Sequence, residues 1–450
     1  MKKLSIAAAV AVASMSVASA TPMTEVIKSM DLNGMLRLRF HNYTRKYNPG
    51  TNHTDVNNGF NRWETSAKLV FKIKADENLD FIWRFSSNAN NYSTALANDR
   101  NNKSDGDPNL KTNLIFFKYH NSGLVVMGGK LGVPTPITSA DPIRTGHGAG
   151  VIAQYKIMDG LTIAGGWVDK LQNANAQTIT YRPTNDNDVD VWNNNILDTD
   201  IFVAALNYKN DLLNASLWYF NLPNVLNYEW IGQLGVKYGL GNGMTLTGGV
   251  DYAQSKLSKH LYHVKGGPDN HIVNNNQGRT WNGLYLNPDT AYLDQNNIHN
   301  YSDNWKVKTY VNLYAGIKSD AWYGTLGYAR SNNRTGVIVT DTDAPLNDIF
   351  GLENIQGIAN RGDENHGSVT ALYTKLGFKP MDKLTTYLNL ARFRQGGNFY
   401  GVEYKVGADF AYNKKVKFGA YFDNTNMGAA FKSKANPNQR EFQVEAKYSF

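Results

Sequence analysis

Hydrophobic and polar residues alternate over many stretches of this chain of 450 residues. In the last of these stretches every second residue is apolar: Phe442, Val444, Ala446, Tyr448 and Phe450. Polar residues such as Glu445 and Lys447 occupy the positions between them. Because successive side chains of a β-strand point to opposite faces, this period of two predicts strands with one apolar and one polar face.

The alternation predicts eighteen strands, joined by short and long connections in turn. Tight turns such as Asn121-Ser122 and Ser319-Asp320 alternate with mostly longer polar stretches such as 170–198 and 255–305. This order is typical of an up-and-down barrel, and sixteen strands is the alternative if one hairpin is miscounted. The strands are expected near 31–41, 61–74, 78–88, 110–120, 123–131, 147–157, 160–169, 199–209, 212–220, 229–239, 243–254, 306–319, 321–331, 367–379, 382–393, 399–412, 415–425 and 440–450.

A soluble β-sandwich also has alternating strands, so alternation alone does not distinguish it from a barrel in a membrane. The sequence contains no second sheet pattern and no repeat unit, and its aromatic residues gather near the expected strand ends. These residues include Trp63, Trp167, Trp230, Trp322, Tyr412 and Tyr448. Aromatic girdles of this kind are typical of membrane interfaces. The sequence therefore predicts an all-β fold, a transmembrane antiparallel β-barrel of about eighteen strands.

The first twenty residues have the pattern of a secretory signal peptide. Met1-Lys2-Lys3 is basic, a run of apolar and small residues extends from Leu4 to Ala20, and Ala18-Ser19-Ala20 matches a cleavage site. A retained transmembrane helix is the alternative, but the run is barely long enough to span and Thr21-Pro22 follows at once. We therefore expect residues 1–20 to be removed and residues 21–450 to form a barrel in the outer membrane of a Gram-negative bacterium.

Composition and motifs exclude several classes of protein. The chain has no cysteine, so disulfide frameworks and thiolate metal sites are excluded, and its net charge of +8 includes no basic run that would bind nucleic acid. The segment 123–130 resembles a phosphate loop, but Leu124 and Leu131 replace residues that such a loop requires. There is no G-x-S-x-G and no H-E-x-x-H motif.

We expect a water-filled channel for passive diffusion of ions and small hydrophilic solutes. The alternative is an outer-membrane lipase, protease or phosphotransferase whose site no motif reveals.

The polar face of each strand would line the lumen, where charged side chains bias the passage of ions. The charged candidates are Arg37, Arg39, Arg62, Glu64, Lys68, Arg84, Lys130, Lys306, Lys308, Glu403, Lys405, Asp409 and Glu445. Within this set, Arg37, Arg39, Arg62 and Arg84 lie on the first, adjacent strands and form a basic cluster. Many of the others are equally explained as solvated wall, away from the narrowest point.

Several segments resemble the Campylobacter major outer membrane protein family. The resemblance covers the stretch from Thr21 to Arg39, Val126-Met127-Gly128-Gly129-Lys130, Gly148-Ala149-Gly150-Val151, and Asp159 through Asp169, as well as the final strand. The mass of 50.2 kDa suggests a paralogue of about 50 kDa rather than the major porin itself. The resemblance implies an eighteen-stranded general porin. The major member of the family is trimeric, with calcium bound near the constriction.

By analogy with general porins, the third long loop, 132–146, is expected to fold inward and narrow the channel. Asp141 and Arg144 of this loop would then face the basic cluster. Asp141 is the only acid of the loop, whereas calcium needs six to eight oxygen ligands. Loop 170–198 supplies weak metal candidates, but it lacks the Gly and Glu of an EF-hand: Asp186, Asp188 and Asp190. We therefore expect no required cofactor, and Ca²⁺ follows only from the resemblance.

The final strand ends in Tyr448 and Phe450, a pattern resembling the assembly signal of bacterial outer-membrane barrels. We expect this strand to pair with 31–41, because an open edge in hydrocarbon leaves backbone groups without hydrogen bonds. The expected partners are the barrel assembly machinery, outer-membrane lipids and lipopolysaccharide, and the ions and solutes that pass. The oligomeric state is left open between a homotrimer and a monomer. No nucleic-acid partner is expected.

Overall fold

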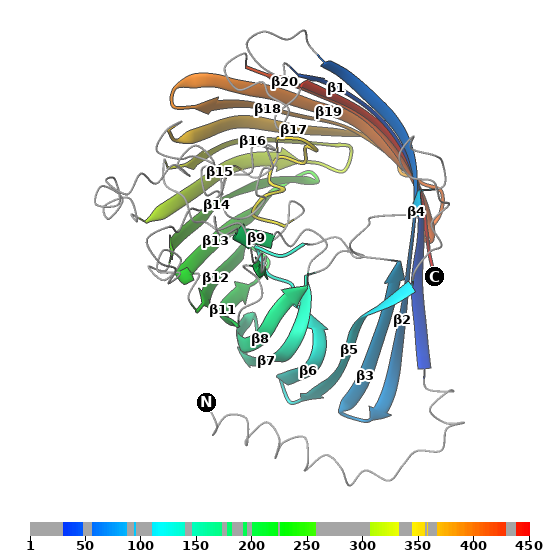
Figure 1. Ribbon diagram of the computed structural model, residues 1–450, viewed down its shortest axis with the longest axis vertical. Coiled ribbons are helices and arrows are strands. Elements are labelled where there is room, and N and C mark those ends of the chain that lie inside the picture. Colours follow the sequence, from blue (N-terminus) through cyan, green and yellow to red (C-terminus); the bar gives the residue numbers. More distant parts are fainter. Residues whose placement is uncertain are drawn as a thin grey trace, which may run out of the picture.

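The alternating stretches form one closed antiparallel sheet in the computed structural model (Figure 1). The structure describes residues 30–47, 56–87, 94–95, 110–139, 146–172, 178–181, 192–195, 200–223, 226–257, 307–332, 344–355, 358, 367–428 and 438–450. The eighteen wall strands are β1 (Met30–Tyr47), β2 (Val56–Asp76), β3 (Leu79–Ser87), β5 (Leu110–Asn121), β6 (Leu124–Gly132), β7 (His147–Met158), β8 (Leu161–Gln172), β11 (Ile201–Lys209), β12 (Leu213–Leu222), β13 (Leu226–Gly241), β14 (Met244–Leu257), β15 (Lys308–Lys318), β16 (Trp322–Ser331), β17 (Val369–Met381), β18 (Leu384–Gln395), β19 (Asn398–Ala411), β20 (Val416–Met427) and β21 (Asn438–Ser449). The prediction of eighteen strands is confirmed.

The barrel closes between its first and last strands. Strand β1 pairs with β2 on one side and with β21 on the other, where Arg37 lies opposite Lys447. Gly34 and Phe450 extend this seam with two backbone hydrogen bonds of 2.9 and 3.1 Å. The backbone groups along the seam are therefore satisfied, which a strand edge in hydrocarbon requires.

Tight turns on one end of the barrel are specified by local chemistry. Ser122 and Asn242 have positive φ angles of 44° and 50°, in the left-handed region that tight hairpins use. Asn413 accepts hydrogen bonds of 2.8 Å from the backbone N–H groups of Lys415 and Val416 through its side chain. Short turns of this kind lie at the periplasmic end of an outer-membrane barrel, so the longer loops mark the extracellular end.

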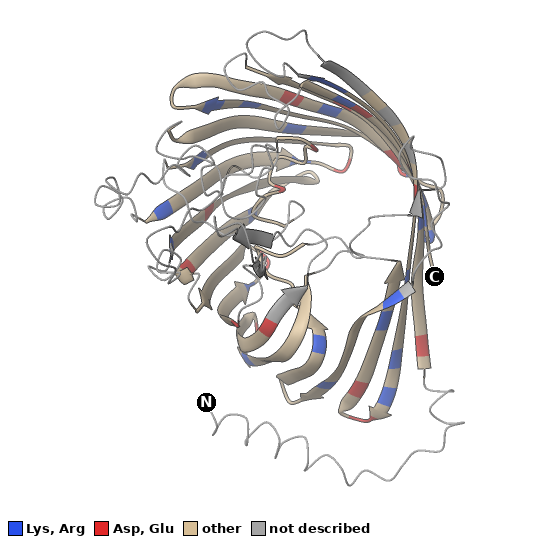
Figure 2. Ribbon diagram, viewed as in Figure 1, with Lys and Arg blue, Asp and Glu red and all other residues tan. Residues whose placement is uncertain are grey.

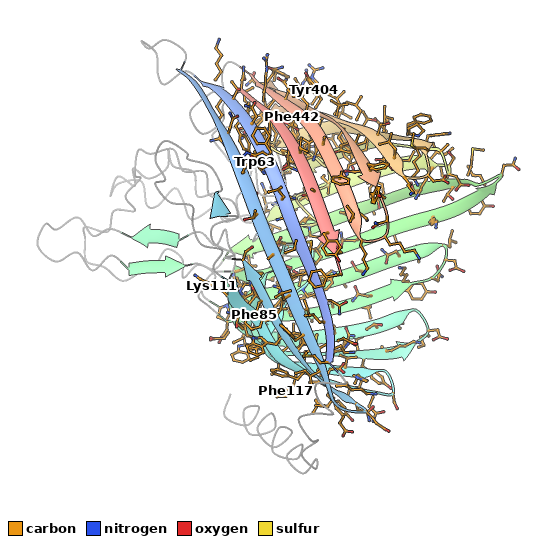
Figure 3. The ribbon with its side chains drawn as sticks, turned by 90° about the vertical axis from the view of Figure 1, so that its right-hand side faces the viewer. Trp63, Phe85, Lys111, Phe117, Tyr404 and Phe442 are labelled. Atoms are coloured by element: carbon orange, nitrogen blue, oxygen red, sulfur yellow. The ribbon has the colours of Figure 1, made fainter. Side chains whose placement is uncertain are left out.

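The burial pattern is the reverse of a soluble protein's. Leu326 and Leu372 face outward with 66% and 58% of their surface exposed, whereas Lys308 and Glu403 face inward and are fully buried. Three of the rings labelled in Figure 3 are likewise exposed: Trp63, Phe117 and Phe442. An apolar band on the outside and charges on the inside are what a barrel in lipid requires.

Three short strands are additional to the eighteen, and one of them belongs to the same sheet. Strand β4 (Thr94–Ala95) pairs with β2, and β9 (Thr178–Tyr181) pairs with β10 (Trp192–Asn195) as a separate two-stranded sheet. The sequence predicted only polar connecting stretches there. Among the described residues no helix is long and apolar enough to cross a membrane. The expected signal peptide, residues 1–20, lies outside the described residues and stays a prediction.

Candidate functional site

The inner face of the first strands carries several of the charged residues that the sequence singled out. Arg37, Glu64 and Arg84 are buried there, with 4–6% of their surface exposed. Arg39, two residues along β1 from Arg37 and on the same face, forms an ion pair of 2.5 Å with Glu445 across the seam. The side chain of Arg62 lies outside the described part of the chain, as do Lys306, Asp141 and Arg144.

The register differs from the prediction at Lys130. This residue lies directly opposite Ile115 on one neighbouring strand and Ala149 on the other. Directly opposed residues share a face, and the 40% exposed Ile115 faces outward. The prediction that Lys130 lines the lumen is therefore wrong. The fully buried Leu131 faces inward in its place, since a shift of one residue reverses the face.

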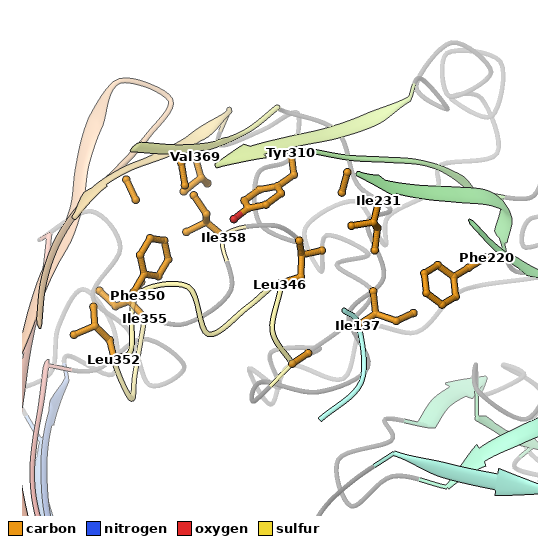
Figure 4. Close-up of a cluster of buried hydrophobic side chains, with 14 of the residues drawn as sticks. Ile137, Phe220, Ile231, Tyr310, Leu346, Phe350, Leu352, Ile355, Ile358 and Val369 are labelled. Carbon is orange, nitrogen blue, oxygen red and sulfur yellow. The ribbon is translucent and has the colours of Figure 1, made fainter. Parts of the chain in front are cut away.

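Two loop segments lie inside the barrel and contact each other (Figure 4). The loop-3 segment, residues 133–139, and the loop-7 segment, residues 344–355, share one hydrophobic cluster with the inner wall. The N–H of Leu346 donates a 3.0 Å hydrogen bond to the carbonyl of Pro136. Inside the loop-3 segment, Thr138 donates to the carbonyl of Val133 through its hydroxyl. Whether these segments narrow the channel stays a prediction.

Aromatic packing fixes the loop-7 segment to the wall. Phe350 lies edge-on to Tyr373 and Phe393, with ring centroids 5.1 and 5.2 Å apart. Leu352 and Ile355 are also buried, with 1–2% of their surface exposed. Full burial of one such side chain is worth about 1.5–3 kcal/mol. Because several such side chains are buried in one short segment, they hold the loop-7 segment in one position on the wall.

Glu403 of β19 binds the backbone of the loop-7 segment. Its carboxylate accepts N–H hydrogen bonds from Glu353 (2.9 Å), Asn354 (2.7 Å) and Ile355 (2.5 Å). The amide of Asn354 donates a further bond of 2.8 Å to Asp423 of β20. These bonds satisfy backbone donors that would otherwise be buried without a partner.

A turn in this segment depends on glycine. Gly351 has a φ of +64°, and a Cβ atom at this position would lie 2.7 Å from the side-chain nitrogen of Asn389. That same nitrogen donates a 2.8 Å hydrogen bond to the carbonyl of Gly351. A side chain here would break the contact between the loop and β18, because it would strain the backbone and displace Asn389.

Charge pairs complete the attachment of the loop. Lys405 of β19 forms a 2.5 Å ion pair with Glu353 and lies 4.3 Å from the ring centre of Tyr421. Burial opposes ionisation of Glu353, but the charge and hydrogen bond of Lys405 act together with the nearby charge of Arg39 to lower the pKa of this carboxyl. Burial raises the pKa of Asp348, only partly offset by Lys375 and Lys405. The two acids of the loop therefore respond to pH in opposite directions.

A second network joins the seam strands beside the loop. The imidazole of His41 lies 3.1 Å from a carboxylate oxygen of Glu441 and 3.3 Å from one of Glu64. Glu441 also accepts a 2.8 Å hydrogen bond from the hydroxyl of Tyr421. Through Tyr421, this network reaches Lys405 and the loop-7 segment. The sequence analysis did not single out His41.

The sequence analysis also missed the loop-7 segment, which lies in the connecting stretch between the expected strands 321–331 and 367–379. A signal was present: Leu346, Phe350, Leu352, Ile355 and Ile358 are large apolar residues in a stretch without strand alternation. Apolar residues in a loop need a surface on which to be buried. In a barrel with an apolar exterior in lipid, that surface can also be the inner wall.

No group of three or more His, Asp or Glu residues within the described ranges is arranged to hold a metal ion. The weak calcium candidates Asp141, Asp186, Asp188 and Asp190 lie outside those ranges. Calcium binding therefore stays an expectation drawn from the resemblance.

Comparison with known proteins identifies the family. The family model described as Campylobacter major outer membrane protein matches residues 1–448. Among solved structures, OpdQ of Pseudomonas aeruginosa is similar with a TM-score of 0.60 and 13% identity, over 95% of this chain and 99% of that one. The outer membrane protein OpdK from the same organism has a TM-score of 0.60 and 12% identity, over 93% and 98% of the two chains. No curated protein sequence matches the chain.

The structural likeness at this identity concerns the fold, and the family match covers almost the whole chain. Both agree with an apolar outer wall, a charged inner wall and a closed seam. The chain belongs to the Campylobacter major outer membrane protein family and is a porin of the Gram-negative outer membrane.

Proposed function

We propose that the narrowest part of this porin lies between the docked loop segments and the basic inner wall of β1–β3. The observation that carries the proposal is the attachment of the loop-7 segment to the inner wall by three backbone hydrogen bonds to Glu403. A loop fixed in this way occupies part of the cross-section at all times. Ions and small hydrophilic solutes then pass beside it by diffusion, without enzymatic conversion.

Charge on the two sides of this passage is unequal. Glu403 and Asp423 are engaged with the loop backbone and with Asn354, and Glu353 is paired with Lys405. The inner wall of β1–β3 carries Arg37 and Arg84, together with Glu64, which lies 3.3 Å from His41. Fixed charges at a constriction bias the ions that pass. We therefore propose that Arg37 and Arg84 raise the share of current carried by anions.

The test is the double variant Arg37→Gln/Arg84→Gln, purified and reconstituted in planar bilayers under a salt gradient. We expect the reversal potential to move toward the value for cations, because the local field loses two positive charges. The matched control is Lys414→Gln/Lys415→Gln, which removes two exposed charges from the turn between β19 and β20. An unchanged reversal potential in the folded, heat-modifiable inner-wall variant would contradict the proposal, as would an equal shift in the control.

The absence of enzymatic activity is tested separately. The folded barrel in detergent is assayed with ester, peptide and phospholipid substrates. We expect turnover no higher than that of the heat-denatured protein. Turnover that depends on the folded state would favour the alternative of an outer-membrane enzyme on a barrel scaffold.

A further inference from the structure

Three exposed arginines stand together on the outer face of the barrel at its loop end. Arg330 lies near the end of β16, and Arg392 and Arg394 lie near the end of β18. All three side chains are exposed. Each of these strands runs from a short turn toward the loop end, so the arginines lie on the extracellular side of the apolar band. In Figure 2, basic residues mark the left-hand ends of several strands in the upper part of the barrel.

The register shows how close the three residues are. Arg330 lies directly opposite Thr370 of β17, and Thr370 lies directly opposite Arg394. Two strand spacings therefore separate the backbones of Arg330 and Arg394, about 10 Å. Arg392 lies two residues along β18 from Arg394, on the same face and about 7 Å away. The three guanidinium groups can therefore reach one shared anionic headgroup or two adjacent ones.

Apolar side chains beside the three arginines, and toward the turn end from them, indicate the depth of the cluster in the membrane. Leu372 lies directly opposite Arg392 and opposite Tyr328, and Leu326 follows two residues along β16. Both leucines are among the most exposed apolar residues on the outer wall. The guanidinium of Arg392 lies 5.8 Å from the ring centre of Phe399. The arginines thus begin where the apolar band ends, the level at which lipid headgroups meet hydrocarbon.

Charge balance indicates what binds there. Within the described residues, no carboxylate forms an ion pair with Arg330, Arg392 or Arg394. Three like charges at this spacing repel one another in a partly apolar setting. Guanidinium groups match phosphate oxygens with paired hydrogen bonds, and arginine is the usual choice for this contact. Toward the opposite, turn end the outer wall carries exposed aromatic residues such as Trp322, Phe378 and Tyr448.

We propose that Arg330, Arg392 and Arg394 form a binding site for the phosphate groups of lipids in the outer leaflet. The site holds a phosphorylated lipid headgroup against the wall formed by β16, β17 and β18. It depends on the location of the barrel in the outer membrane and is independent of any constriction in the lumen.

The test uses the full mature barrel in nonionic detergent, titrated with bisphosphorylated lipid A and with dephosphorylated lipid A. We expect the wild type to retain the phosphorylated lipid preferentially in native mass spectrometry. The triple variant Arg330→Gln/Arg392→Gln/Arg394→Gln should lose that preference by roughly tenfold to a hundredfold, since each basic residue at a charged surface contributes about 1 kcal/mol. The matched control is Lys379→Gln/Lys383→Gln/Lys415→Gln, three exposed residues at the turn end of the same wall. It should retain the preference.

Any of three other outcomes would overturn the proposal. Equal loss in the control would indicate a general effect of net charge. Equal retention of the two lipids by the wild type would show that phosphate is not recognised. Displacement of the lipid by millimolar inorganic phosphate would assign the site to free phosphate. The heat-modifiable mobility of the triple variant verifies that it is folded, so its binding result stands.

Discussion

The two faces of strand β19 differ completely, although their residues alternate along one chain. The outward face forms part of the apolar band with Val402, Tyr404 and Val406. Inward, Glu403 and Lys405 bind the loop-7 segment through its backbone and through Glu353. The outer face needs only to be apolar, so many side chains suit it. The inner face needs particular hydrogen-bond partners at particular positions. The difference indicates that composition determines the outer wall and specific contacts determine the inner one.

The largest effect is expected from a charge placed on the outer face. Leu326→Arg should destabilise the barrel by about 2–4 kcal/mol, the cost of Arg at the bilayer midplane, because Leu326 lies mid-strand and is 66% exposed. Thr325→Arg, one residue away on the inner face, should cost about 1 kcal/mol or less, since lumen positions face water. Urea unfolding in lipid vesicles measures both. Equal costs would contradict the assignment of the two faces.

The next effect concerns the loop. Glu403→Ala removes the acceptor for three backbone N–H groups, and an unpaired buried donor costs about 1–3 kcal/mol. We expect the loop-7 segment to leave the wall while the barrel stays folded, with single-channel conductance changing about twofold and current noise increasing. Asp409→Ala is the control, because Asp409 faces inward on the same strand without a described contact to the loop. Unchanged conductance and noise in Glu403→Ala would show that the contact does not hold the loop.

A smaller effect is expected from a substitution at the seam, where the measured quantity is the amount of assembled barrel. The rings of Tyr448 and Phe450 lie 5.6 Å apart, and a Cβ atom at Gly34 would overlap the Phe450 ring. Phe450→Asp should lower the heat-modifiable form severalfold and leave unassembled protein in the periplasm. Phe422→Asp is the matched outward charge. If both reduce assembly equally, Phe450 has no special role and is one more lipid-facing residue.

The smallest effect is that of pH on the loop. The depressed pKa of Glu353 means that its pairing with Lys405 stabilises the docked loop above the usual carboxyl range, about pH 4, and is lost as pH falls through the lower pKa. Asp348, with a raised pKa, acts in the opposite sense and favours the docked state on protonation. Closing and opening rates measured from pH 7 to pH 3 should change only a few-fold. Glu353→Gln should remove the weakening at low pH, and a variant that retains it would contradict this account.

The sequence predicted the wall because alternation is local and every strand repeats it. The eighteen strands and the pairing of the last with the first are confirmed, down to the outward position of Phe442 and the inward position of Glu445. Lys130 was assigned to the wrong face of the strand. Gly128 and Gly129 precede it, and glycines do not indicate which alternate positions face the lumen and which face lipid.

The loop-7 segment could not be placed from the sequence in the same way. Its contacts with Glu403 and Asp423 join positions 48 to 69 residues apart. Backbone N–H groups provide most of the polar contacts, and these groups are the same at every residue except proline. No pattern of side chains therefore indicates that this stretch binds to β19. The apolar residues around Phe350 indicate burial, but not the surface against which they are buried.

The seam between β1 and β21 has a consequence for the time course of folding. Arg39 and Glu445 meet across 406 residues of chain, whereas each hairpin joins neighbours within a few residues of its turn. Contacts of such sequence separation form late, since chain entropy must be lost before they contribute. Until they form, the barrel is an open sheet with two unpaired edges, each a template for wrong pairing. The rate of barrel closure, rather than the rate of strand formation, therefore determines how long the nascent protein needs protection from aggregation.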